Sequence, residues 1–168
     1  MIRRRAPRLP ADLAAHLPHG TRTLAVAELL DGSWAVTAQD ALTVLGADGV
    51  RTRASWDEVE SARWDGETRQ LTVFWVEGAR GPLVLTTADD GVERFTSTLR
   101  ERVQSSVVHS ETTELPSGAL VTANVRRGPG GELLSQVTAR GPLAGDRAEQ
   151  DVIDELERRV RDAVGLPT

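Results

Sequence analysis

Short runs of alternating hydrophobic and polar residues follow one another from Gly20 to Thr86. This period of two is typical of β-strands that bury one face. The clearest run places Leu71, Val73 and Trp75 on one face. We therefore expect seven strands, over residues 23–30, 33–37, 41–45, 50–55, 59–64, 70–76 and 81–86.

The polar residues between these runs predict how the strands connect. Asp31-Gly32 separates the first two runs, and this dipeptide is typical of a tight β-hairpin. Glycine-containing turns also follow the third, fifth and sixth runs, at residues 46–49, 65–67 and 77–80, so neighbouring strands are expected to pair antiparallel.

After the last of these runs, the spacing of the hydrophobic residues changes from two residues to three or four. Val92, Phe95, Leu99 and Val103 recur at spacings of three, four and four, which places them on one face of a helix. Asp89 can cap its start, where a carboxylate also suits the helix dipole. The pattern predicts an amphipathic helix that packs against the preceding strands.

A second change follows Val107. The runs Leu120–Arg126 and Glu132–Ala139 flank Gly128-Pro129-Gly130-Gly131, which predicts a hairpin with a loop longer than two residues. A final helix is expected after Asp146, its N-cap. Its hydrophobic stripe comprises Val152, Leu156 and Val160, and Gly165 and Pro167 end it.

These elements predict an α+β protein. Residues 20–110 should form a curled antiparallel sheet of about seven strands capped by one helix. Residues 111–168 should form a C-terminal β-hairpin and helix, packed on or beside the first domain. Residues 1–19 are rich in proline and arginine and are expected to form an N-terminal arm, with one helical turn around residues 11–16.

The strand series carries a family resemblance. Four strands, then three, then one helix, with Trp56-Asp57-Glu58-Val59 entering the fifth strand, resemble the bacterial pleckstrin-homology-like (PH-like) domains. The chain also resembles actinobacterial proteins of about this length. The resemblance covers residues 20–110 and implies a PH-like fold and a role in binding.

The same comparison argues against one ligand. Phosphoinositide-binding members of the wider superfamily carry basic residues around the loop between the first two strands. Here that loop, residues 28–32, contains Glu28 and Asp31 and no base. A phosphate headgroup would meet like charge, so we expect no phosphoinositide binding at this loop.

Composition excludes several kinds of chemistry. The 168 residues include no cysteine, so disulfides and thiolate sites are absent. All 20 basic residues are arginines, which excludes Schiff-base and P-loop lysines. The pair His16 and His19 is separated by Pro18 and is expected in a surface loop, and His109 is expected to be a junction residue. We therefore predict no catalytic residue, cofactor or metal, and no enzyme activity.

Charge narrows the set of partners. The formal net charge is −5, and it divides into +4 over residues 1–22 (five arginines, one aspartate) and −9 over the rest (15 arginines, 24 acids). Such an acidic body repels nucleic acid and anionic lipid. Only Arg3-Arg4-Arg5 and Arg8 could attract them, and an arm that is solvated or docked on the acidic body of opposite charge is favoured. No apolar run reaches the roughly 20 residues of a membrane helix, and the start lacks a signal-peptide core, which favours a cytoplasmic location.

The function favoured is a non-enzymatic module that binds a protein partner or itself. The binding surface is expected at a sheet edge, at the C-terminal hairpin, or in the groove between the last strand and the Val92–Val103 helix. An exposed tryptophan is a natural anchor. The candidate surface residues are Trp56, Trp64, Val92, Phe95, Arg126 and Arg127.

Two alternatives stay open. The first is an enzyme or small-ligand-binding protein with a site between the two segments, where Asp57 and Glu58 would meet Arg126 and Arg127. The second is nucleic-acid or membrane binding through residues 3–8.

Overall fold

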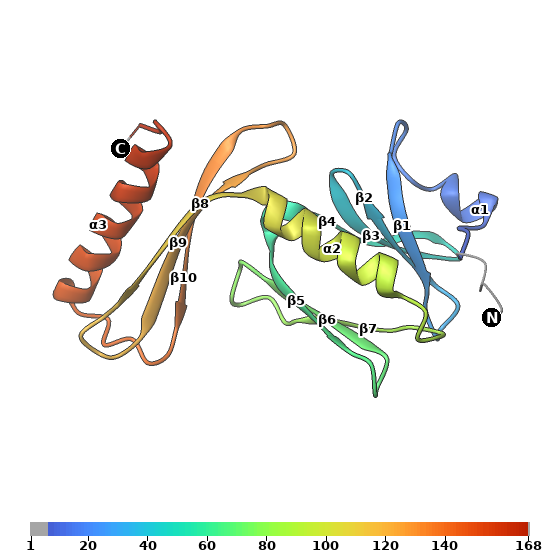
Figure 1. Ribbon diagram of the computed structural model, residues 1–168, viewed down its shortest axis with the longest axis horizontal. Helices are drawn as coiled ribbons and strands as arrows, with labels where there is room; N and C mark the ends of the chain where they lie inside the picture. The colour runs from blue at the N-terminus through green and yellow to red at the C-terminus, as the bar shows by residue number, and fades with distance from the viewer. Residues whose placement is uncertain (1–6, 168) are drawn as a thin grey trace. The chain divides into compact units, whose positions relative to one another are not determined.

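The computed structural model describes residues 7–167. Over these residues the protein is α+β, with ten strands in three antiparallel sheets and three α-helices (Figure 1). The chain divides into two compact units, which we call unit 1, ending at Gln104, and unit 2, beginning at Ser105. Arg3, Arg4 and Arg5, the basic end of the expected arm, lie outside the described residues.

Unit 1 contains seven strands in the places where the alternation predicted them. They form a four-stranded sheet of order β1-β2-β3-β4 and a three-stranded sheet of order β5-β6-β7. Helix α2 follows the last strand, as the change of period predicted. The elements are β1 (Thr23–Glu28), β2 (Trp34–Ala38), β3 (Ala41–Gly46), β4 (Gly49–Ser55), β5 (Val59–Asp65), β6 (Gln70–Trp75), β7 (Leu83–Thr86) and α2 (Glu93–Ser106).

The main core of unit 1 lies between these two sheets and α2. The predicted stripe of α2, formed by Val92, Phe95, Leu99 and Val103, is buried in this core together with inward-facing residues of both sheets. Burial of such apolar side chains contributes about 1.5–3 kcal/mol each. The prediction of an amphipathic helix packed on the strands is confirmed.

The outer face of the four-stranded sheet is also covered. The short helix α1 (Ala11–Ala14) places Leu13 against Trp34, Val36 and Leu45, and these four residues form a second buried cluster. This cluster explains why every residue of β2 and β3 is buried, since each strand has packing on both faces. The N-terminal segment from residue 7 is therefore part of the packing of unit 1.

The β1–β2 connection differs from the predicted two-residue turn. The backbone N–H of Gly32 donates to the carbonyl of Leu29 (3.0 Å), and that of Leu29 donates to the carbonyl of Ser33 (2.8 Å). Gly32 has φ = 81°, a conformation that favours glycine. The result is a three-residue loop with a bulge at the glycine, which is the next most common hairpin type.

Unit 2 contains a three-stranded antiparallel sheet of order β10-β9-β8 and the helix α3. The predicted hairpin and final helix are present, but the prediction omitted a strand. That strand, β8, pairs with β9 over its whole length. The elements are β8 (Val107–Glu114), β9 (Leu120–Arg127), β10 (Leu133–Arg140) and α3 (Arg147–Ala163).

Helix α3 packs on one face of this sheet. Leu156 and Val160 meet Val121, Ala123 and Val125 of the central strand in a buried cluster. As predicted, the carboxylate of Asp146 caps α3 by accepting from the backbone N–H of residue 149 (2.9 Å).

The side chain of Glu149 ties the start of α3 to two loops. Its carboxylate is buried and accepts from the backbone N–H groups of Ala144 (2.7 Å), Gly145 (3.1 Å) and Ser117 (3.3 Å). The pKa of Glu149 is lowered, first by the Ser117 side chain and then by these backbone N–H groups. The ionised carboxylate thus joins the turn after β8 to the loop before α3.

Candidate interaction surface

A groove of about 250 Å³ runs along unit 1 between the edge strand β5 and α2, and we call it the β5–α2 groove. Strand β5 is the end strand of its sheet and pairs with β6, and no second strand of the described residues pairs with its residues 61–65. The groove is lined by Glu60, Ser61, Ala62, Trp64, Leu71, Thr96, Leu99, Arg100, Val103 and Gln104.

The positions of these residues follow from the periods of the two elements. Ala62 and Trp64 of β5 are opposite Val73 and Leu71 of β6, which puts them on the core side of the sheet. On α2, Thr96 lies beside the buried stripe, one turn before Arg100. The groove therefore lies where the contact between the apolar face of α2 and the edge of the sheet ends.

The groove combines an apolar floor with a polar rim. Leu71 and Leu99 are buried at its base, and Trp64 is half-buried beside them. Glu60 and Arg100 place opposite charges at the rim. An extended chain laid along residues 61–65 of β5 would meet the edge of the sheet on one side and apolar contacts on the other.

Two of the four tryptophans were considered as exposed anchors. Trp64 is half-buried and lines the β5–α2 groove. Trp56 is only 6 % exposed, and its indole N–H donates to the carbonyl of Ala38 (3.1 Å). The expectation of an exposed Trp56 is therefore wrong, because the turn before β5 folds this ring into the core.

Val92 and Phe95 are not surface residues either, since both are buried in the main core. Their edges line a second groove of about 390 Å³, between β1 and α2. Pro7, Arg8 and Leu9 of the N-terminal segment form another wall of this groove.

Arg126 and Arg127 belong to unit 2. Arg126 is only 3 % exposed, and its Nη1 donates to Ser106 Oγ (3.1 Å). Arg127 is exposed and donates to the carbonyl of Gly131 (3.3 Å). Of the six candidate surface residues, Trp64 is therefore the one that lines the β5–α2 groove. Sequence reasoning missed Thr96 and Arg100, which could have been found as the polar residues that border the α2 stripe.

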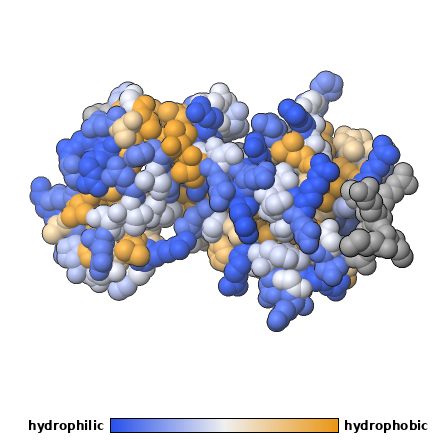
Figure 2. All heavy atoms as spheres, in the orientation of Figure 1, coloured by the Kyte–Doolittle hydropathy of each residue, from blue (hydrophilic) through white to orange (hydrophobic). Residues whose placement is uncertain are grey.

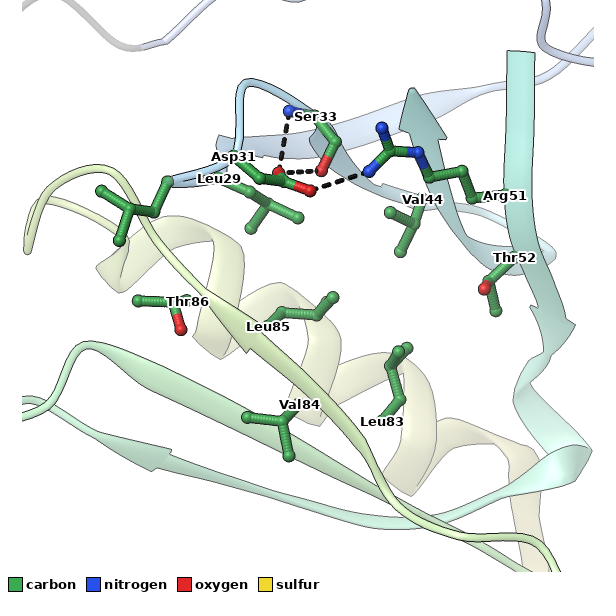
Figure 3. Close-up of a pocket in the computed structure, with 11 residues that line it drawn as sticks. Leu29, Asp31, Ser33, Val44, Arg51, Thr52, Leu83, Val84, Leu85 and Thr86 are labelled. Carbon is green, nitrogen blue, oxygen red and sulfur yellow. Dashed lines mark hydrogen bonds and ion pairs between the residues drawn. The ribbon is translucent and has the colours of Figure 1, made fainter. Parts of the chain in front are cut away.

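A third hollow, of about 570 Å³, opens beside the β1–β2 loop (Figure 3). Leu29, Leu83 and Leu85 point into it. At its rim, Asp31 accepts hydrogen bonds from the backbone and hydroxyl of Ser33 and pairs with Arg51 (2.7 Å). These contacts, the Ser33 hydrogen bonds first, lower the pKa of Asp31 to about 2. The guanidinium that the fold brings to this acidic loop is thus already matched by a carboxylate.

His109 lies within β8 and has a structural partner. In unit 2, His109 contacts Glu111 (3.2 Å), which also pairs with Arg159 of α3 (3.0 Å). These two neighbours, His109 first, lower the pKa of Glu111. Across residues 7–167, no three His, Cys, Asp or Glu side chains are grouped so that they could hold a metal ion.

The residues of the small-ligand alternative are divided between the two units. Asp57 and Glu58 lie in a short 3₁₀ helix of unit 1, whereas Arg126 and Arg127 lie in β9 of unit 2. That alternative stays a prediction. No helix in the described part of the chain is long and apolar enough to cross a membrane.

Comparison with known proteins adds no assignment: no family model matches the chain, and no curated protein matches it either.

Proposed function

We propose that the protein is a non-enzymatic interaction module in which a PH-like unit 1 binds an extended peptide segment of a partner protein along the β5–α2 groove. The observation that carries this proposal is an apolar groove that lies beside the end strand of a sheet, along residues 61–65 of β5. An edge strand supplies main-chain hydrogen bonds to an added strand, and the neighbouring groove receives its side chains.

The PH-like assignment rests on the order of elements. Four antiparallel strands, then three, then one helix follow along the chain of unit 1, as the resemblance to this family implies. The helix packs into the same core as both sheets. This arrangement supports the assignment, which remains our proposal.

The groove also indicates the chemistry of the peptide. Trp64 and Leu99 favour an apolar side chain at the centre of the segment. Arg100 at the rim favours an acidic residue beside it. Since the body of the protein is acidic, we propose a protein partner in preference to nucleic acid, phosphoinositide or membrane lipid.

The substitution Thr96→Arg tests this proposal. A peptide is first selected from a random display library on the full chain, and its dissociation constant is measured by fluorescence anisotropy. Thr96 borders the groove, so a long cationic side chain there should obstruct it. We expect the dissociation constant to rise about tenfold or more, which corresponds to about 1.4 kcal/mol.

Ser97→Arg is the matched control. Ser97 is the next residue of α2, is exposed and does not line the groove, so the selected peptide should bind this variant as it binds the natural chain. Equal binding to all three proteins would place the peptide elsewhere, and failure to select any peptide would contradict the proposed function.

A further inference from the structure

The edge strands of unit 1 are each interrupted or shielded. The ladders at β1, β4 and β5 all contain a register shift. Strand β4 carries Arg51 and Arg53, and β5 carries Glu60, Arg63 and Asp65. Strand β7 has four residues, and one end of it accepts a hydrogen bond from the backbone of the β1–β2 loop. Short length, bulges and charges are the devices by which proteins prevent edge-to-edge association.

The two edge strands of unit 2 differ from each other. Strand β8 contains a register shift and carries Glu111 and Glu114. Strand β10 pairs with β9 over eight consecutive residues without a shift, and its charge is confined to the last of them, Arg140. Among the edge strands of the described residues, β10 is thus the one that is long, regular and uncharged over seven residues.

Apolar side chains flank this open edge on both faces of the sheet. Leu133 and Val137 are partly buried and pack against the same buried cluster as Ile153 and Val164 of the α3 region. Leu134 faces the other way and is 38 % exposed. Figure 2 shows hydrophobic side chains at the surface of the part of the molecule that β8–β10 and α3 form.

We propose that β10 pairs antiparallel with β10 of a second copy of this chain, which joins two three-stranded sheets into one six-stranded sheet. The two-fold axis passes beside Ser135, so that Leu133 of each copy lies opposite Val137 of the other. This proposal concerns unit 2 and does not depend on the β5–α2 groove.

The register follows from the direction of the backbone groups. The N–H of Gly128 donates to the carbonyl of residue 132 (2.8 Å), and the ladder continues from there without a shift. Hydrogen-bonded and non-hydrogen-bonded pairs alternate along an antiparallel ladder. Residues 134 and 136 therefore bond to β9, whereas Leu133, Ser135 and Val137 direct their N–H and C=O groups away from it. These are the groups that a second β10 strand would meet.

The neighbouring helix is self-complementary about the same axis. The hydroxyl of Ser135 donates to Glu157 (2.5 Å) and accepts from Arg161 (2.9 Å), so the middle of this α3 face lies beside the proposed axis. A two-fold rotation there places Glu157 of one copy opposite Arg161 of the other, twice. The apolar ends of the face, Ile153 and Val164, are exchanged in the same way. This charge and apolar complementarity favours a second copy over an unrelated partner.

The test is the mass of the full chain in solution, measured by sedimentation velocity over a wide range of concentrations. We expect a concentration-dependent species of twice the 18.2 kDa chain mass. Ser135→Pro should abolish it, because proline removes an outward N–H without removing a bond to β9. A natural chain that stays monomeric throughout would overturn the proposal.

Two controls separate pairing from loss of the side chain. Ser135→Ala removes the hydroxyl but keeps the N–H, so it should still dimerise. Ser110→Pro makes the same change on β8, the opposite edge of the sheet. Leu115 is hydrogen-bonded to Ala119, so by the same alternation the N–H of Ser110 points away from β9. This variant should therefore still dimerise. A dimer that survives in Ser135→Pro, or one lost equally in Ser110→Pro, would overturn the proposal.

A second pair of variants applies if Ser135→Pro fails to fold. Leu134→Lys places a charge on the β10 edge, whereas Leu120→Lys places it at a similarly exposed position of the central strand β9. We expect the first to raise the dimer dissociation constant about tenfold or more and the second to leave it nearly unchanged. Equal effects would contradict pairing through β10.

Discussion

Strands β5 and β10 both lie at the edge of a sheet but differ in regularity, in charge and in the surface beside them. Strand β5 is bulged, carries three charges and borders a groove. Strand β10 is regular, nearly uncharged and borders a helix face with alternating charges. A second copy of β5 would bring its own bulge and would have to align it with the first, whereas an unrelated peptide can adapt its backbone to the single bulge of β5. A copy of β10 matches β10 by symmetry.

The difference shows that an open edge does not by itself specify its partner. The pattern of side chains along the edge decides whether a strand pairs with a copy of itself or with a strand of a different protein. The two proposed pairings lie in different units, so substitutions can test one without the other.

The largest expected effect is that of Leu156→Ala. Leu156 is fully buried between α3 and the sheet of unit 2, and its truncation should cost about 2–5 kcal/mol. Dimerisation through β10 should weaken or disappear, while peptide binding at the β5–α2 groove should persist.

The tryptophans allow the unfolding of unit 1 to be measured separately from that of unit 2. All four, at positions 34, 56, 64 and 75, lie in unit 1. In urea, the unfolding transition seen by far-UV circular dichroism should acquire an early phase in Leu156→Ala, while the tryptophan fluorescence transition stays in place. A parallel shift of both signals would mean that the units unfold together.

Much of the fold could be predicted because its signals are local. Alternation located the seven strands of unit 1, and the 3.6-residue period located α2 and α3. Strand β8 was missed because its residues alternate between half-buried and exposed, so no clear apolar face marks it. The turn after it held the missing signal, since Leu115-Pro116-Ser117-Gly118 repeats the Pro and Gly spacing of Gly128-Pro129-Gly130-Gly131.

The two turns form in the same way. The N–H of Gly118 donates to the carbonyl of Leu115, as that of Gly131 donates to Gly128, and both glycines have positive φ (84° and 87°). Recognising one turn should therefore have predicted the other, and with it a third strand.

A smaller effect is expected from the charges of α3. Glu157→Arg would place like charges across the proposed two-fold axis and should weaken the dimer by about 1 kcal/mol, or roughly fivefold in its dissociation constant. The double variant Glu157→Arg with Arg161→Glu exchanges the two charges and should restore it. Sedimentation equilibrium at low ionic strength measures both. If the double variant does not restore the dimer, the proposed contact between the two α3 helices is wrong.

The smallest expected effect concerns acid. The pKa of Glu149 is lowered from its ordinary value of 4.5. Its stabilisation of unit 2 is therefore fully present above that value and is lost as the pH falls through the lowered pKa. Glu149→Gln should flatten this acid dependence in circular dichroism.

Unit 1 provides the contrast for this variant. The pKa of Asp31 is about 2, so its share of stability persists to lower pH. The tryptophan fluorescence of Glu149→Gln should accordingly follow the natural chain in acid. If the loss of the circular dichroism signal at low pH is the same in Glu149→Gln and in the natural chain, Glu149 does not determine the acid stability of unit 2.

The site was less predictable than the fold. Trp64 was recognised as a candidate, but the burial of Trp56, Val92 and Phe95 depends on contacts between distant segments that periodicity does not report. The regularity of β10 also became visible only through its register, because a bulge leaves no mark in the sequence alone.

The short turns of unit 2 have a consequence for how the chain orders itself. Each strand of that sheet is paired with its neighbour in sequence, so the ladder closes through loops of a few residues and little chain entropy is lost at each step. The strands of unit 1 also pair with their neighbours in sequence, but unit 1 must in addition bring Arg94 to the backbone of Leu24, 70 residues away, and the N-terminal Leu13 to β2 and β3. The corresponding contact in unit 2, between Glu111 and Arg159, joins residues 48 apart. Unit 1 therefore carries the larger entropic cost of joining distant segments, while the sheet that carries β10 can assemble from local contacts.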